Sequence, residues 1–315
     1  MAYVVLGAGA VGGTLGFRLA QSGQEVLFIA RGAHGEAMGE RGLRLESPVG
    51  AETMRVRVLA STADYTFAEG DCVLLCVKSQ DVMAAVASLD RRLPIVCFQN
   101  GVSAEPAAAD SLEHVYGAMT WIPALHLEPG VVQVFSHDPA GRFRLGAYPV
   151  GEDERTWAMA RDLVQAGFEA ASVPNVMRWK HSKLLLNLGN AVDAFGLPDP
   201  GFPELVQRAV EEGRACLRAG HIDFLPTGEL LSAMQAGEQP AQTIAGQARQ
   251  GGSTWQSASR GQPLETEHLN GWIVQHGLRL GIPTPVNRAL AHLSKVATAP
   301  RSVPLDQVLR WVEEK

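Results

Sequence analysis

The first half of the chain alternates short apolar runs with amphipathic stretches. The apolar runs predict strands at residues 3–6, 25–30, 72–77 and 94–98. The third run is continuous, as expected for a strand that is covered on both faces. Helical spacing of apolar residues predicts helices at 11–22 and 81–89. This strand–helix–strand rhythm indicates a parallel sheet with right-handed crossovers.

The pattern changes twice farther along the chain. Between about residues 116 and 148 it alternates and is rich in turn residues, which predicts antiparallel strands around Pro129-Gly130 that extend the sheet. After Pro174, helical periods predict helices at 177–195, 203–219 and 265–280, and the Gly-, Ser- and Gln-rich residues 246–261 predict a loop. We therefore expect an α/β chain, with a Rossmann-type, doubly wound domain over residues 1–175 and an all-helical domain over 176–315.

Composition and charge exclude several classes of protein. Of the 315 residues, 46% are hydrophobic and 19% are charged, which is typical of a globular protein with a sizeable core. A net charge of −6 argues against a nucleic-acid partner. The N-terminus has no basic region before its glycines, and no apolar run approaches the roughly 20 residues that span a bilayer. We therefore expect no membrane partner and a cytoplasmic location.

Four cysteines are present, and three of them lie within apolar runs. The spacing of Cys72 and Cys76 is compatible with a metal site, but no second pair of cysteines or histidines accompanies it. We expect buried, reduced thiols and no metal.

A glycine pattern follows the first predicted strand and opens the first predicted helix. Gly7, Gly9 and Gly12 form G-x-G-x-x-G in that context. The first glycine allows the tight turn, the second lets a pyrophosphate approach the backbone, and the third allows close packing of helix on strand. The pattern predicts a dinucleotide site, and the alternative is a glycine-rich turn without a ligand.

The end of the second strand indicates which dinucleotide is bound. NAD enzymes usually carry a carboxylate there for the ribose 2′-hydroxyl. Here Ala30 is followed by Arg31 and Gly32. A guanidinium pairs well with a 2′-phosphate, so we expect NADPH (or NADP) as the cofactor. The alternative is an ordinary solvated arginine.

The predicted helix that starts near residue 177 carries a polar stripe. Lys183, Asn187 and Asn190 are spaced i, i+4 and i+7 and would share one helix face. A positioned ammonium can stabilise negative charge on a ketone oxygen and donate a proton to it. From spacing alone, Lys183 could equally be a surface lysine.

These residues resemble the ketopantoate reductase (2-dehydropantoate 2-reductase) family over nearly the whole chain. The family has the same glycine pattern, and an arginine ends its second strand as Arg31 does here. Lys78 matches its lysine after the fourth strand, and Gln99-Asn100-Gly101 matches its Gln-Asn-Gly turn. Its W-x-K-L-x-x-N motif is matched from Lys183 through Asn187, with His181 at the tryptophan position. Its T-E-x-D-x-x-N-G and G-x-x-x-P motifs are similar to residues 264–271 and 281–285.

The resemblance implies roles for individual residues. Lys183 would donate the proton, Glu265 would hold that lysine or the substrate, and Lys78 and Asn100 would contact the cofactor. Substrate contacts would come from Asn100, Asn187, Asn190 and Ser253. The residues also allow plainer interpretations: Asn100 as a left-handed turn residue, Glu265 as the first-turn acid of a helix, and Ser253 as a solvated loop residue.

The chain departs from the family pattern near the expected substrate. Ala191 stands at the family's second asparagine, with Asn190 one place earlier, and Leu264 replaces its threonine. Trp121 and Trp255 are bulkier than the family pattern, which indicates either a larger substrate or core anchors.

The resemblance implies NADPH-dependent reduction of a 2-oxo acid, with 2-dehydropantoate to pantoate, a step of pantothenate biosynthesis, as the leading reaction. The alternatives are a reductase of a bulkier ketone or an imine, and a dinucleotide-binding protein without turnover. The oligomeric state stays open, and the helical domain could form the contact of a homodimer.

Overall fold

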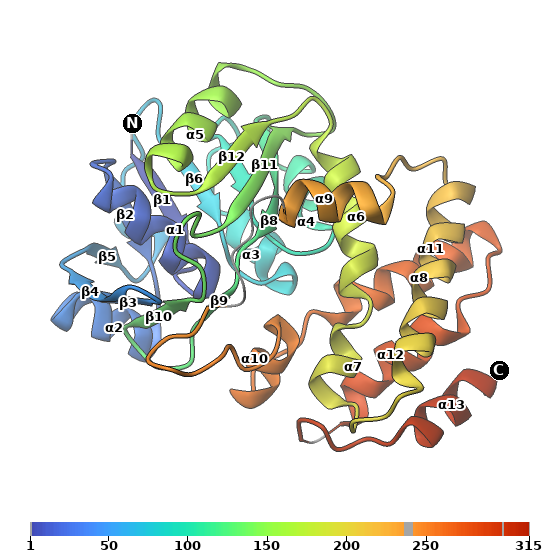
Figure 1. Ribbon diagram of the computed structural model, residues 1–315. Coiled ribbons are helices and arrows are strands. Elements are labelled where there is room, and N and C mark those ends of the chain that lie inside the picture. The colour runs from blue at the N-terminus through green and yellow to red at the C-terminus, as the bar shows by residue number, and fades with distance from the viewer. Residues whose placement is uncertain (1, 236–241, 298, 315) are drawn as a thin grey trace. The chain divides into compact units, whose positions relative to one another are not determined.

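The computed structural model describes residues 2–235, 242–297 and 299–314 (Figure 1). The chain divides into two compact units. The first comprises residues 1–179 and 231–249, and the second comprises residues 180–230 and 250–315. Helix α6 (Val176–Asn187) and helix α9 (Thr227–Gln235) each contribute residues to both units.

Within the described residues, the first unit is built on an eight-stranded sheet. In spatial order its strands are β12 (Glu169–Ser172), β11 (Arg142–Ala147), β8 (Val115–Trp121), β7 (Ile95–Cys97), β6 (Cys72–Leu75), β1 (Tyr3–Leu6), β2 (Val26–Ile29) and β5 (Arg57–Leu59). Neighbours from β8 to β5 are parallel, and β11 pairs antiparallel with β8. The four strands predicted in the first half are confirmed to within two residues at each end.

Helices cover both faces of this sheet, as a doubly wound fold requires. Helices α1 (Ala10–Gln21) and α5 (Glu154–Gln165) pack on one face, and α3 (Val82–Val86) and α4 (Ala104–Ala109) pack on the other (Figure 1). Successive strand residues point to opposite faces. Tyr3 and Val5 therefore join the core under α1 and α5, whereas Val4 and Leu6 join the core under α3 and α4.

A second, four-stranded sheet in the described part of this unit was not predicted, and the strands that flank Pro129-Gly130 belong to it and do not extend the main sheet as expected. Its order is β4 (Gly50–Met54), β3 (Leu43–Ser47), β10 (Val131–Val134) and β9 (Ala124–Leu125). Helix α2 (Gly32–Arg41) leads into it from β2, and short 3₁₀ turns follow at η1 (Thr62–Asp64) and η2 (Ser79–Asp81). A Cβ atom on Gly13 of α1 would lie 2.6 Å from Cγ1 of Val132, so a glycine lets α1 pack closely on β10.

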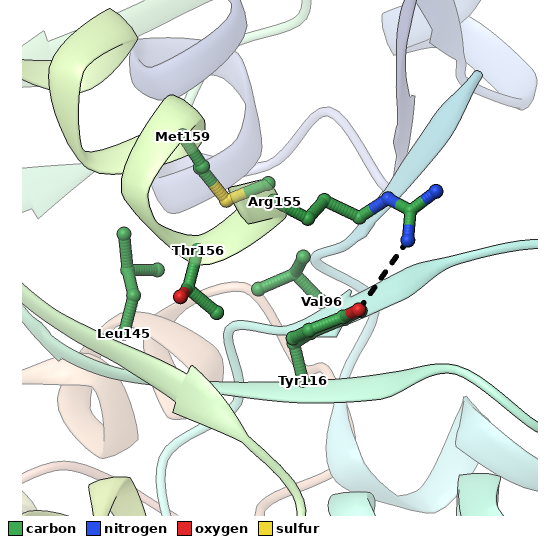
Figure 2. A pocket seen from close by; sticks show the side chains of 6 residues that line it. All are labelled: Val96, Tyr116, Leu145, Arg155, Thr156 and Met159. Carbon is green, nitrogen blue, oxygen red and sulfur yellow. Dashed lines mark hydrogen bonds between the residues drawn. The ribbon is translucent and has the colours of Figure 1, made fainter. Parts of the chain in front are cut away.

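Helix α5 begins with a capping box. Asp153 accepts a hydrogen bond from the Thr156 backbone N–H at 2.9 Å, and Thr156 Oγ1 accepts one from the Asp153 N–H at 3.0 Å. Asp153 Oδ2 also accepts from the Tyr116 hydroxyl at 2.6 Å. Figure 2 shows Arg155 donating to the same hydroxyl, at 3.4 Å, beside a gap between α5 and the sheet. That gap is too narrow for a water molecule, so it is a packing feature.

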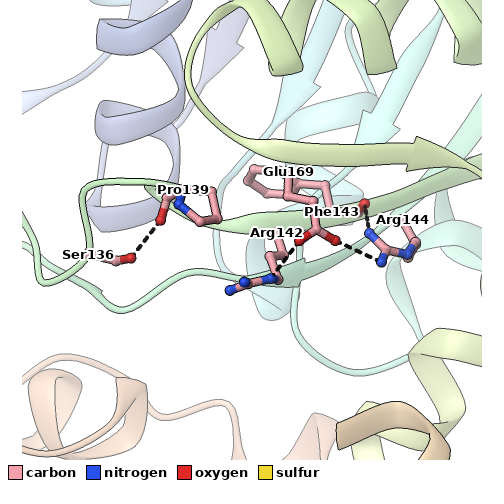
Figure 3. A network of polar contacts seen from close by, with 6 residues as sticks. All are labelled: Ser136, Pro139, Arg142, Phe143, Arg144 and Glu169. Carbon is pink, nitrogen blue, oxygen red and sulfur yellow. Dashed lines mark hydrogen bonds and ion pairs between the residues drawn. The ribbon is translucent and has the colours of Figure 1, made fainter. Parts of the chain in front are cut away.

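Ion pairs connect the edge strand β12 to its neighbour β11 (Figure 3). Glu169 accepts from Arg142 Nε at 2.8 Å and from Arg144 Nη2 at 2.9 Å. The Arg144 guanidinium also lies over the Trp179 ring, 5.3 Å from its centroid. Since Arg142 and Glu169 are register partners, this cluster fixes the pairing of β11 with β12.

The described residues of the second unit are helical, as expected. They include the helices α7 (Asn190–Phe195), α8 (Phe202–Ala219), α10 (Ser253–Ser259), α11 (Asn270–Leu280), α12 (Pro285–Val296) and α13 (Leu305–Glu313), with the turn η3 (Thr266–His268). Helix α12 packs against α7, α8, α11 and α13. Buried Asn270 donates to Asn287 Oδ1 at 3.0 Å, and Asn287 donates to Glu212 at 2.8 Å. Across the described ranges, no helix is both long and apolar enough to cross a membrane.

Three predicted boundaries in this region were wrong. The helix expected at 177–195 is broken at Leu188-Gly189, where a Cβ on Gly189 would lie 3.0 Å from Val206. The helix expected from Glu265 starts only at Asn270, because Leu269 has non-helical dihedrals (φ −112°, ψ −93°). The loop expected at 246–261 contains α10, whose buried residues are Thr254 and Ser257, so it lacks an apolar period.

Candidate dinucleotide and substrate site

The glycine turn joins β1 to α1. Gly7 has φ +102°, and a Cβ there would lie 2.7 Å from the Val77 nitrogen. A Cβ on Gly12 would lie 2.1 Å from the Gly7 carbonyl oxygen. Gly9 differs, because no atom of the described residues lies within 4 Å of its Cβ position. Gly7 and Gly12 therefore allow the close backbone contacts of the turn, and Gly9 leaves space for a ligand.

The strand order places this turn at a topological switch point. The chain leaves β1 for β2 on one side, and later reaches β6 on the other side of β1. Dinucleotides bind outside the carboxyl ends of parallel strands at such a point. Gly9 is the N-cap of α1. The free N–H groups of the first helical turn and the helix dipole favour phosphate there.

Arg31 follows β2 after one intervening residue, Ala30, and is the N-cap residue of α2. It is exposed, and the next residue, Gly32, has φ +59°. A Cβ on Gly35 would lie 2.3 Å from the Ala30 carbonyl oxygen, so the turn from β2 into α2 is tight. Since β1 and β2 are parallel neighbours, Arg31 and the glycine turn lie at the same edge of the sheet.

Lys78 and Asn100 follow the next two parallel strands, β6 and β7, at that same edge. The Gln99 side chain donates to the Leu75 and Val77 carbonyl oxygens, both at 2.9 Å, and so ties the two strand ends together. The positive φ in this turn, +86°, belongs to Gly101. A left-handed conformation therefore does not explain the asparagine at position 100.

In the second unit, Lys183 and Asn187 lie one turn apart on α6. Nδ2 of Asn187 is buried and has no hydrogen-bond partner within the described part of the chain. A buried amide without a partner costs about 1–3 kcal/mol, which a ligand that accepts its hydrogen bond would offset. The prediction that Asn190 continues the same helix face was wrong, because Asn190 begins the separate helix α7.

Ser253 and Glu265 also lie in this unit. Ser253 is the first residue of α10, and the N–H of the preceding Gly252 donates to Asp193 of α7 at 3.1 Å. Helix α10 therefore packs beside the helix that begins with Asn190. Glu265 precedes the turn η3 and accepts from the His268 N–H through its carbonyl oxygen. It is thus no first-turn acid of α11, which excludes that plainer interpretation.

The two tryptophans have different surroundings. Trp121 ends β8 and pairs in register with Arg142. Trp255 folds onto the backbone at the start of its own helix, since a Cβ on Gly251 would lie 2.6 Å from its indole. Trp255 therefore acts at least in part as a packing residue.

The cysteines are free thiols. Burial raises the pKa of Cys72 to about 12, which keeps its sulfur protonated at neutral pH. A search of the described residues finds no group of three or more His, Cys, Asp or Glu that could hold a metal ion.

The structure thus gathers Gly7, Gly9, Gly12, Arg31, Lys78 and Asn100 at one edge of the first unit's sheet. One further residue at this edge was not predicted: His34 of α2, whose ring contacts the glycine turn through the Ala8 carbonyl oxygen at 2.8 Å. No sequence motif marks this histidine.

Comparison with known proteins identifies the family. Residues 3–149 match the model described as "Ketopantoate reductase PanE/ApbA", and residues 175–298 match "Ketopantoate reductase PanE/ApbA C terminal". A 2-dehydropantoate 2-reductase of Halobacterium salinarum is 30% identical over 314 residues, which covers 94% of this chain and 99% of the relative.

Comparison with solved structures supports the same family. A PanE/ApbA family ketopantoate reductase from Ralstonia eutropha JMP134 has a TM-score of 0.78 and 30% identity, covering 94% of this chain and 98% of its own. D-mandelate dehydrogenase, solved with NADH and anilino(oxo)acetate, shares the fold at a TM-score of 0.79, with 21% identity over 94% of this chain and 97% of that one. The family match supports a nicotinamide dinucleotide as cofactor. With its glycine turn at the switch point, this chain belongs to the ketopantoate reductase family of oxidoreductases.

Proposed function

We propose that the protein uses NADPH to reduce a 2-oxo acid to a 2-hydroxy acid, with 2-dehydropantoate to pantoate as the leading reaction. The observation that carries the proposal is the pair on α6: Lys183 lies one turn from Asn187, whose buried amide nitrogen lacks a partner in the described chain. A substrate or cofactor oxygen would satisfy that amide. The lysine would then be near the same group.

The cofactor would be held by residues of the first unit. The open position at Gly9 and the start of α1 suit a pyrophosphate. The exposed guanidinium of Arg31 suits a 2′-phosphate, and Lys78 and Asn100 would lie toward the nicotinamide half. Bound NADPH supplies the hydride, which adds to the carbonyl carbon of the oxo acid.

Residues of the second unit would manage the charge and the proton. As the hydride adds, the electron pair of the C=O double bond moves to oxygen, and the ammonium of Lys183 stabilises that charge and transfers a proton to it. Glu265 would orient the lysine or the substrate. Asn187, Asn190 and Ser253 would bind the substrate, with Ser253 at its carboxylate.

Replacing Lys183 tests this mechanism. Lys183→Ala should bind NADPH as the wild type does but lose at least a hundredfold in kcat, since general acid catalysis contributes about 10²–10⁴. Stopped-flow or steady-state NADPH oxidation gives kcat, and fluorescence titration gives Kd for NADPH. The matched control is Lys295→Ala, an exposed lysine of α12 paired with Glu267, which should keep its turnover. A near-normal kcat in Lys183→Ala would remove this lysine from the mechanism.

A second candidate is a reductase for a bulkier 2-oxo acid or an imine. Trp121 at the end of β8 favours it, as does the shared fold of D-mandelate dehydrogenase, which was solved with an aromatic oxo acid. A panel that contains 2-dehydropantoate, an aryl-substituted 2-oxo acid and a cyclic imine separates the candidates by kcat/KM. Binding of NADPH without turnover of any panel member would favour the dinucleotide-binding protein instead.

A further inference from the structure

His34 connects three segments of the first unit through its side chain. It lies in the first turn of α2, three residues after Arg31. Its Nε2 is 2.8 Å from the Ala8 carbonyl oxygen in the glycine turn. Its Nδ1 is 2.9 Å from the backbone nitrogen of Gly130, which precedes β10 of the small sheet.

These two contacts define the protonation of the ring. The Gly130 N–H can only donate, so Nδ1 of His34 must carry a lone pair. The Ala8 carbonyl can only accept, so Nε2 must carry the proton. His34 is therefore a neutral imidazole in the Nε2–H tautomer. The neighbouring ring of His126, with its centroid 4.1 Å away, donates from Nδ1 to the Val131 carbonyl at 2.9 Å.

The contact at Ala8 fixes the orientation of a peptide plane. In a trans peptide the C=O and the next N–H point in opposite directions. With the Ala8 carbonyl held by His34, the Gly9 N–H points away from His34. The Cβ position of Gly9 is the open one of the turn. A pyrophosphate that enters the turn would meet this N–H together with those of the first turn of α1.

We propose that His34 is a positioning residue for the nicotinamide dinucleotide, because its neutral ring sets the Ala8–Gly9 peptide that receives the pyrophosphate. Its place on α2 also ties the glycine turn to the turn that carries Arg31. The inference rests on the proposed binding of NADPH at this turn. It concerns binding of the pyrophosphate, which NADPH and NADH both carry.

Two conservative variants separate the two hydrogen bonds of His34. In His34→Asn, Oδ1 replaces Nδ1 as acceptor for Gly130, but the side chain is too short to reach the Ala8 carbonyl. In His34→Gln, Nε2 can still donate to the Ala8 carbonyl. We expect His34→Asn to raise Kd about tenfold for both NADPH and NADH, about 1.4 kcal/mol. We expect His34→Gln to stay within about threefold of the wild type.

Fluorescence titration gives both Kd values without turnover, and kcat at saturating NADPH should be unchanged in both variants. His114→Asn, an exposed histidine of the same unit, is the matched control and should bind as the wild type does. Equal Kd values for wild type and His34→Asn, or equal losses in both His34 variants, would overturn the role of His34. A wild type that binds neither dinucleotide would instead overturn the proposed cofactor, and this inference with it.

A measurement on the wild type covers the case in which His34→Asn does not fold. Nitrogen-15 NMR distinguishes the two neutral tautomers and the charged ring. We expect the neutral Nε2–H form of His34 at pH 7.5, both with and without NADPH. A charged ring, or the Nδ1–H form, in the NADPH complex would contradict the proposal.

Discussion

Arg31 is the residue that we expect to select the cofactor. It lies just after β2, where residues 28–32 include no carboxylate for a ribose 2′-hydroxyl, and its side chain is exposed beside a tight turn. The position of this arginine could be found from the sequence, because the end of the strand that follows the G-x-G-x-x-G motif is a local feature. Its preference for NADPH over NADH stays a prediction.

Arg31→Ala should raise KM for NADPH at least tenfold and leave KM for NADH nearly unchanged, because only NADPH carries the 2′-phosphate that the guanidinium would pair with. Steady-state kinetics with each cofactor measures the split. The control is Arg41, an exposed arginine in the last turn of α2. Arg41→Ala should leave KM unchanged for both cofactors. Equal use of NADPH and NADH by the wild type would defeat the prediction.

At the scale of elements, the sequence identified those with a regular apolar pattern. Strand β6, from its continuous apolar run, and helix α8, from its helical period, were predicted within two residues at each end. The small sheet was missed because β4 is mostly exposed and β9 is only two residues long. The break between α6 and α7 was missed because it depends on packing of Gly189 against Val206, which no local pattern reports.

The capping box of α5 makes an element-scale prediction. Asp153→Ala should lower the free energy of unfolding by about 1–2 kcal/mol, since it removes an N-cap, and also the acceptor of the Tyr116 hydroxyl. Asp153→Asn should retain most of the stability, because asparagine caps helices as well as aspartate does. Urea unfolding of both variants gives the comparison. Equal losses in the two variants would show that charge, and not capping, is what matters at this position.

At the scale of the whole molecule, the acid stability of the fold depends on buried carboxylates such as Asp71. Burial by itself would raise the pKa of Asp71, but hydrogen bonds from the Ala2 and Ala68 N–H groups and the Tyr65 hydroxyl outweigh it and hold the pKa below the usual value. A carboxyl with a lowered pKa stabilises the fold above its unfolded pKa of about 3.9. That contribution is lost as the pH falls through the lower, folded value.

Asp71→Asn should therefore cost about 2 kcal/mol of unfolding free energy at pH 7, since its amide group would face donors. The difference from the wild type should shrink as the pH falls below about 3.9. Urea unfolding at pH 7 and pH 3 tests both statements, with Asp64→Asn, an exposed carboxylate of η1, as the control. A difference that does not change with pH would contradict the assignment to the Asp71 charge.

Domain organisation and assembly are also properties of the whole molecule. The change to helical periods after Pro174 predicts two domains, and the chain divides into two compact units. The domain boundary near residue 176 and the homodimer stay predictions. Size-exclusion chromatography with light scattering would settle the dimer.

The sequence by itself was sufficient to predict the doubly wound sheet, the glycine turn, the position of Arg31 and the family. Each of these predictions depends on the spacing of residues that are near one another in the chain. Only the tertiary structure revealed that the Cβ position of Gly9 has open space around it and that the buried amide nitrogen of Asn187 has no hydrogen-bond partner in the described chain. It also revealed the hydrogen bond between His34 and the Ala8 carbonyl oxygen. These properties depend on contacts between segments that are distant in sequence. The periodicity of a sequence does not report whether a buried polar group has a hydrogen-bond partner, or how closely two backbone segments approach each other.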